Sequence, residues 1–146
     1  MVTRAESAIA RLRSERDTTL RSLSSLPEPA CKLPARWAGT DRTVNFLLRM
    51  FTAHQMDHMQ QLQKMLRDRQ HTMTEPQLLL MRAQAIQGEL EALVLGLSED
   101  EFTQAGQNED DWSVERLVEH VAEVERNYRT EILRAVEQAR VSGGES

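Results

Sequence analysis

Two histidines lie four residues apart in the segment TAHQMDHMQQLQ, and they are the residues of this chain best suited to bind a metal. His54 and His58 make up half of the chain's four histidines. In a helix, residues at i and i+4 share a face, so two imidazoles there can converge on one ion at about 2.0–2.1 Å. Both histidines interrupt an apolar stripe of helical period. That stripe consists of Val44, Leu47, Phe51, Leu62 and Met65.

A third histidine borders the apolar stripe of another expected helix. His120 follows Leu117 by three residues and precedes Val124 by four. Three neutral imidazoles from two facing helices would bind a divalent cation and leave a coordination position open, as catalytic sites require. Zinc, nickel, manganese and iron all accept such ligands. The other interpretation is a chance spacing beside an ordinary packed histidine, and the residues alone leave the two evenly matched. His71 is expected at the surface, outside the site.

Acidic side chains near the histidines are candidates for orienting the imidazoles. Asp57, Glu119 and Glu123 are placed to accept a hydrogen bond from a ring N–H, although solvated helix faces would carry the same residues. Gln55 stands where a zinc peptidase of the His-Glu-x-x-His type needs its glutamate. The sequence therefore argues against a metalloprotease.

Two arginines and the single cysteine complete the residues that could take part in chemistry. Arg49 and Arg116 are candidates for binding an anionic thiol, but nothing in the sequence places them at a pocket. Cys31 lies in a proline-rich linker and is not expected to be functional.

The elements that must position the histidines are helices. Leu, Ala, Glu, Gln and Arg dominate, and alternating apolar and polar runs are absent, so we expect an all-α chain. Capping residues and prolines predict the helix boundaries. The first predicted helix covers about 4–24, and the second covers about 40–69 with Thr40 or Asp41 as its N-cap. The third begins at 74 with a Thr74–Gln77 capping box, and the fourth runs from 113 to about 140. SEDEF predicts a short capped turn, TQAGQNEDD a loop, and 141–146 a flexible tail.

The chain contains two similar halves at an offset of about 70 residues. TVNFLLRM after Trp37 corresponds to SVERLVEH after Trp112, and each half reads as a helical hairpin. Two such hairpins, about 4–69 and 74–140, would bury their stripes against one another about a pseudo-twofold axis. We therefore predict one domain, residues 1–146, folded as a four-helix bundle.

Composition narrows the classes of partner. The net charge is −5 and the basic residues are scattered, which argues against nucleic acid. No apolar run approaches the roughly 20 residues that span a bilayer, and the polar N-terminus is unlike a secretory signal, so no membrane partner is expected. A single cysteine fits a reducing cytoplasm. A small-molecule substrate and a homodimer are the partners we expect.

Two segments resemble the metal-binding helices of the DinB/YfiT-like family. DDWSVERLVEHVAEVERNYRTEIL looks like the helix that Trp-Ser-Val opens, and TVNFLLRMFTAHQMDHMQQLQKML like the helix that carries a histidine pair followed by a Gln-rich turn. The resemblance covers most of the chain and implies a metal triad of His54, His58 and His120. Here the two halves stand in the reverse order, as in a circular permutation in which QHTMTEP joins the usual termini.

The resemblance also implies a function. Characterised relatives include transferases and isomerases that use a low-molecular-weight thiol such as bacillithiol or mycothiol, which a metal activates as a nucleophile. The alternative, which the absence of a convincing general base or nucleophile beside the histidines supports, is a non-catalytic metal-binding or stress-response protein, as a dimer. A shared fold does not decide between them.

Overall fold

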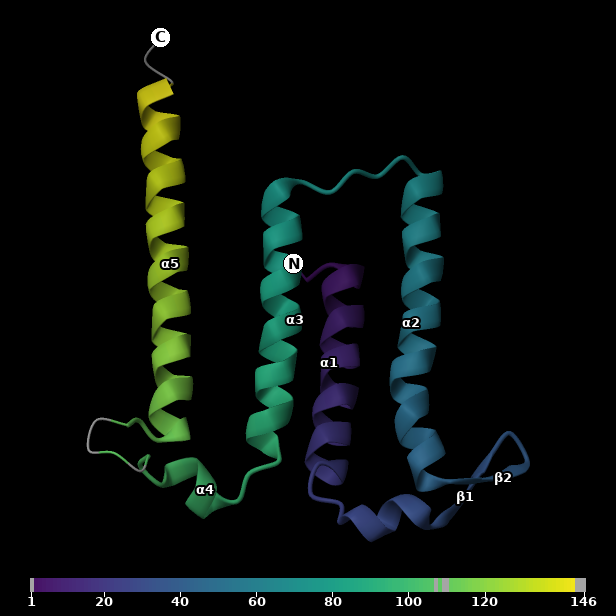
Figure 1. Cartoon of the computed structure of the whole chain (residues 1–146). Coiled ribbons are helices and arrows are strands. Elements are labelled where there is room, and N and C mark those ends of the chain that lie inside the picture. Colours follow the sequence, from purple (N-terminus) through teal and green to yellow (C-terminus); the bar gives the residue numbers. More distant parts are fainter. Residues whose placement is uncertain (1, 107, 109–110, 144–146) are drawn as a thin grey trace. The chain divides into compact units, whose positions relative to one another are not determined.

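A computed structural model describes residues 2–106, 108 and 111–143 of the chain. The chain divides into two compact units, Met1–Leu95 and Gly96–Ser146. Helices make up most of both units, and a single two-stranded sheet is found among the described residues (Figure 1). The predicted all-α class is confirmed at this level. No helix within the described ranges combines the length and the apolar content needed to cross a bilayer.

The first unit begins with helix α1, Arg4–Leu23, as the sequence predicts. A capping box starts it: the backbone N–H of Thr3 donates to Glu6, and the N–H of Glu6 donates to the Thr3 hydroxyl. The prolines that end this helix lead into a short 3₁₀ helix, η1, Glu28–Lys32.

A β-hairpin follows, and it corrects the sequence prediction. Strands β1, Pro34–Trp37, and β2, Thr40–Thr43, pair antiparallel, with Trp37 opposite Thr40. The two turn residues, Ala38 and Gly39, both have positive φ, as tight hairpins require. Because the hairpin holds residues 40–43 extended, the prediction of Thr40 or Asp41 as a helix N-cap was wrong.

Helix α2, Val44–Asp68, starts directly after the hairpin and carries the histidine pair. Its N-cap is Thr43, whose hydroxyl accepts from the N–H of Phe46 at 3.3 Å. The end of this helix near residue 69 agrees with the prediction. Helix α3, Glu75–Leu95, opens with the predicted capping box, in which the N–H of Thr74 donates to Gln77 at 2.8 Å.

The packed part of the first unit lies where α1 ends and α2 begins, next to η1 and the hairpin (Figure 1). Helix α2 contacts η1 and both strands there, and α1 contacts α3. None of the described residues is fully buried. The half-buried apolar residues of this region include Leu20, Leu23, Val44, Leu47, Leu90 and Val94.

The second unit holds the short helix α4, Glu99–Thr103, and the long helix α5, Val114–Gly143, which contact each other. Helix α4 has the predicted capping box between Ser98 and Glu101. Residues 107, 109 and 110 of the predicted loop lie outside the described residues. The tail prediction was wrong for 141–143, which continue α5 because no helix breaker precedes Gly143; residues 144–146 lie outside the described residues.

Candidate metal centre

The structure brings His54 and His58 together on the surface of α2. Their Nε2 atoms lie 3.0 Å apart, and their ring centroids lie 4.3 Å apart with the ring planes at 81°. Two ligand nitrogens on one cation would be about 2.9 Å apart at a right angle and about 3.3 Å apart at a tetrahedral angle, given bond lengths of about 2.0–2.1 Å. The observed separation therefore suits a chelating pair. A hydrogen bond between one protonated and one unprotonated nitrogen gives the same separation.

Gln61 fixes the orientation of one of these imidazoles. Its side-chain oxygen lies 2.9 Å from Nδ1 of His58. An amide oxygen accepts a hydrogen bond, so this contact favours the neutral tautomer of His58 that carries its proton on Nδ1 and its lone pair on Nε2. This is the tautomer that a metal on Nε2 needs, and such an orienting bond is usual for metal-binding histidines.

Helix geometry places the two histidines and Gln61 together, and solvent can reach all three. The spacing of His54, His58 and Gln61 is i, i+4 and i+7, which returns to one face every two turns. All three side chains are exposed, so both imidazoles can reach a ligand from solvent.

His120 lies on α5 in the second unit, where its ring packs against Trp112. The ring centroids are 4.9 Å apart at 77°, and the guanidinium of Arg116 lies 4.7 Å from the centre of the Trp112 ring. Trp112 thus folds back over the first turns of α5. Within residues 2–106, 108 and 111–143, no group of three or more His, Cys, Asp or Glu side chains gathers around one point. The triad stays a prediction.

The acidic candidates are not hydrogen-bonded to the three histidines in the described part of the chain. Asp57, Glu119 and Glu123 are exposed, and none of the hydrogen bonds found in the described part of the chain joins them to an imidazole. Gln61 takes the orienting role instead. Sequence reasoning missed this residue, although its i+3 distance from His58 was a usable signal.

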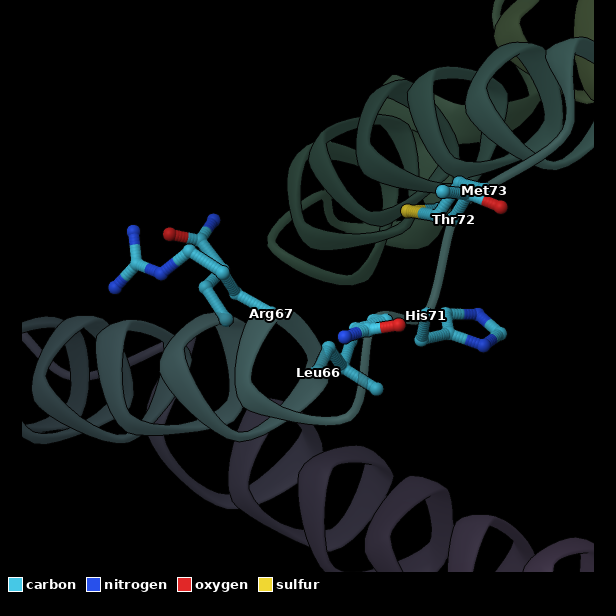
Figure 2. A pocket seen from close by; sticks show the side chains of 7 residues that line it. Leu66, Arg67, His71, Thr72 and Met73 are labelled. Atoms are coloured by element: carbon cyan, nitrogen blue, oxygen red, sulfur yellow. The ribbon is translucent and has the colours of Figure 1, made fainter.

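The remaining histidine and the cysteine lie in separate shallow hollows of the first unit. The His71 hollow has a volume of about 410 Å³ and is formed by the end of α2 and the residues after it. Figure 2 shows the His71 ring and the Arg67 side chain pointing away from one another, so these two polar groups of the hollow do not converge on one point. Half-buried Cys31 lines the other hollow beside the opposite charges of Glu28 and Lys32.

Comparisons with protein-family models, with curated proteins and with solved structures find no match to this chain. The likeness to the DinB/YfiT-like family therefore rests on the motifs quoted above.

Proposed function

We propose that this chain is a divalent-metal-dependent enzyme of the DinB-like kind, in which His54, His58 and His120 hold the ion. The observation that carries the proposal is the 3.0 Å separation between the Nε2 atoms of His54 and His58, with Gln61 fixing the tautomer of His58. In this tautomer the lone pair of His58 is on the nitrogen that faces His54, where a cation shared by the two rings would bind.

The proposal requires the four long helices to close into a bundle that brings α5 to α2. Its support is the apolar stripes that α2 and α5 leave exposed, since large exposed apolar surfaces mark faces that bind another element. On α2 these residues are Phe51, Leu62 and Met65, and on α5 they are Leu117, Val121, Tyr128 and Ile132.

The chemistry follows from three neutral ligands and an open position. A divalent cation lowers the pKa of a thiol or water that binds it, and so supplies a nucleophile at neutral pH. Zinc, nickel, manganese and iron all suit imidazole ligands. The reaction class that this supports best is the transfer or isomerisation of a small molecule with a low-molecular-weight thiol.

The direct test is elemental mass spectrometry on untagged protein after loading with zinc, nickel or manganese. We expect about one ion per chain in the wild type and a large loss in His54→Ala, His58→Ala and His120→Ala. His71→Ala is the matched control and retains the metal. Wild-type protein that binds none of these ions would refute the proposal.

A second candidate is a non-catalytic, dimeric metal-binding or stress-response protein, which one property of α3 favours. The run Leu78-Leu79-Leu80-Met81 points in four directions at 100° steps, so it makes the helix apolar on every side. All four residues are exposed. A helix in a bundle buries one stripe, and the remaining apolar surface of α3 suits a second copy of this chain.

The charges of α3 fit such a pairing. Arg82 and Glu89 are seven residues apart and therefore share a face with the exposed Ile86 and Leu93. In an antiparallel pair of α3 helices centred between Ala85 and Ile86, Arg82 of each copy lies opposite Glu89 of the other.

A thermal melt with and without a chelator separates the two functions. A structural metal contributes to folding, so its removal would lower the melting temperature steeply. An enzyme's open site would change the melting temperature by only a few degrees, and turnover of a thiol-dependent substrate would then decide in its favour.

A further inference from the structure

A charged residue of α1 packs against the face of α2 that carries the histidine pair. Arg16 falls on the apolar stripe of α1 with Ile9, Leu12, Leu20 and Leu23, and it is half-buried. Its Nη2 donates to Oε1 of Gln55 at 2.8 Å, and its guanidinium carbon lies 5.7 Å from the centre of the Phe51 ring. Both contacts join α1 to α2 within the first unit.

The residues that Arg16 touches belong to the same helical face as the histidines. Phe51, His54, Gln55 and His58 occupy positions i, i+3, i+4 and i+7, which lie together on one side of a helix. The two stripes each have a polar interruption, Arg16 on α1 and the histidine pair on α2. The contacts of Arg16 with Gln55 and Phe51 define a seam between these sides of the two helices.

The guanidinium of Arg16 forms no ion pair in the part of the chain that the structure describes. Among the described residues, no carboxylate lies within ion-pair distance of Arg16, and the ion pairs that do occur involve other arginines and Lys64. Its observed partners, an amide oxygen and an aromatic ring, are neutral. A guanidinium has five N–H donors in a planar fork, and a carboxylate or sulfonate matches that fork with two parallel hydrogen bonds. Taking a charge out of water is costly without such a partner.

We propose that the substrate of the histidine site is an anionic small molecule whose carboxylate or sulfonate binds Arg16 while its reacting group approaches His54 and His58. This inference rests on the proposed metal-dependent function and adds the class of substrate. The other candidate arginines are engaged elsewhere: Arg49 donates to Asn45 at 3.4 Å, and Arg116 stacks on Trp112.

The test uses cobalt-loaded protein, because the cobalt absorption spectrum changes when a thiol binds the ion. The probes are 3-mercaptopropane-1-sulfonate and 3-mercapto-1-propanol, which have the same length and differ in charge. We expect the wild type to bind the sulfonate about tenfold more tightly, as charge-assisted hydrogen bonds provide. Arg16→Met should bind both equally, and Arg16→Lys should show an intermediate preference.

Arg11→Met is the matched control, because Arg11 is exposed on the opposite side of α1. This variant should keep the full preference for the sulfonate. A preference that persists in Arg16→Met would overturn the inference while leaving the metal site intact. Circular dichroism of each variant establishes that the helices are retained.

A second measurement separates failure of this inference from failure of the metal site. Propane-1-sulfonate is titrated into metal-free protein while the side-chain Nε–H signals of Arg16 and Arg11 are followed by NMR. We expect a saturable shift for Arg16 alone. If that shift occurs but cobalt is not taken up, the anion site stands and the proposed enzyme fails. If Arg16 shows no saturable shift, the inference is overturned.

Discussion

The Nε2 atoms of His54 and His58 lie 3.0 Å apart on one face of α2, and the amide oxygen of Gln61 holds Nδ1 of His58 at 2.9 Å. These three side chains form a short chain of contacts along two helical turns. Two imidazoles this close share either a proton or a cation. Because Gln61 orients the ring of His58, a substitution at Gln61 should change how the pair binds a cation.

Replacing Gln61 by alanine should weaken metal binding by roughly tenfold, because loss of an orienting partner typically costs 10–100-fold in affinity. Without the accepting oxygen of Gln61, no hydrogen bond keeps the proton of His58 on Nδ1, and the tautomer with a free lone pair on Nε2 is no longer favoured. A zinc titration against a competing chelator measures the change. Gln60→Ala removes a neighbouring exposed amide and should match the wild type. Equal affinities for the two variants would contradict the role given to Gln61.

Replacing Val121 by aspartate should lower the stability of the protein by about 2 kcal/mol or more if α5 packs its apolar stripe into a bundle, because the charge would then be buried without a partner. Urea unfolding followed by circular dichroism measures this. Ala122→Asp introduces the same charge one position away, off the stripe, and should cost much less. Equal effects at Val121 and Ala122 would mean that α5 buries no stripe.

The capping box of α4 should respond to acid. Hydrogen bonds from the Ser98 backbone and hydroxyl hold the pKa of Glu101 below its ordinary value of 4.5. A carboxyl whose pKa is lower in the folded than in the unfolded chain stabilises the folded state at pH values above its pKa in the unfolded chain. That stabilisation disappears as the pH falls through the lowered value.

NMR measures this through the amide shift of Ser98 and the side-chain carboxyl carbon of Glu101. Both should titrate together below pH 4.5. Glu101→Gln keeps an accepting oxygen without the charge, so its Ser98 amide should show no such transition. A Glu101 carboxyl that titrates at or above its ordinary value would contradict the hydrogen bonds described here.

The pairing of α3 with a second copy predicts a charge-swap result. Arg82→Glu and Glu89→Arg each place like charges together, so each should weaken self-association at least about tenfold. Mixing the two variants restores opposite charges at both contacts and should give a heterodimer. Analytical ultracentrifugation detects both outcomes. A wild type that stays monomeric at all concentrations would mean that another segment of the chain covers this face.

Local patterns were the part of the fold that the sequence predicted well. The capping boxes at Thr74–Gln77 and Ser98–Glu101 are confirmed because each depends on residues three positions apart. The common face of His54 and His58 follows from helical period alone. The hairpin was missed because its strands are only four residues long and its turn uses Ala38, a residue that rarely adopts a positive φ.

Contacts between elements were harder to foresee. Helical period places Arg16 on the α1 stripe, and nothing in the sequence alone shows that its guanidinium contacts Gln55. Trp112 precedes α5, and nothing in the sequence alone shows that its ring packs on His120. Such contacts depend on side-chain rotamers and on how helices cross, which periodicity does not encode.

X-ray absorption spectroscopy of the zinc-loaded protein counts the imidazoles around the ion and so tests whether His54, His58 and His120 bind it together. We expect three imidazole nitrogens at about 2.0–2.1 Å in the wild type and two in His120→Ala. A spectrum with two imidazoles in both proteins would contradict the three-histidine centre and leave His54 and His58 as a pair without His120.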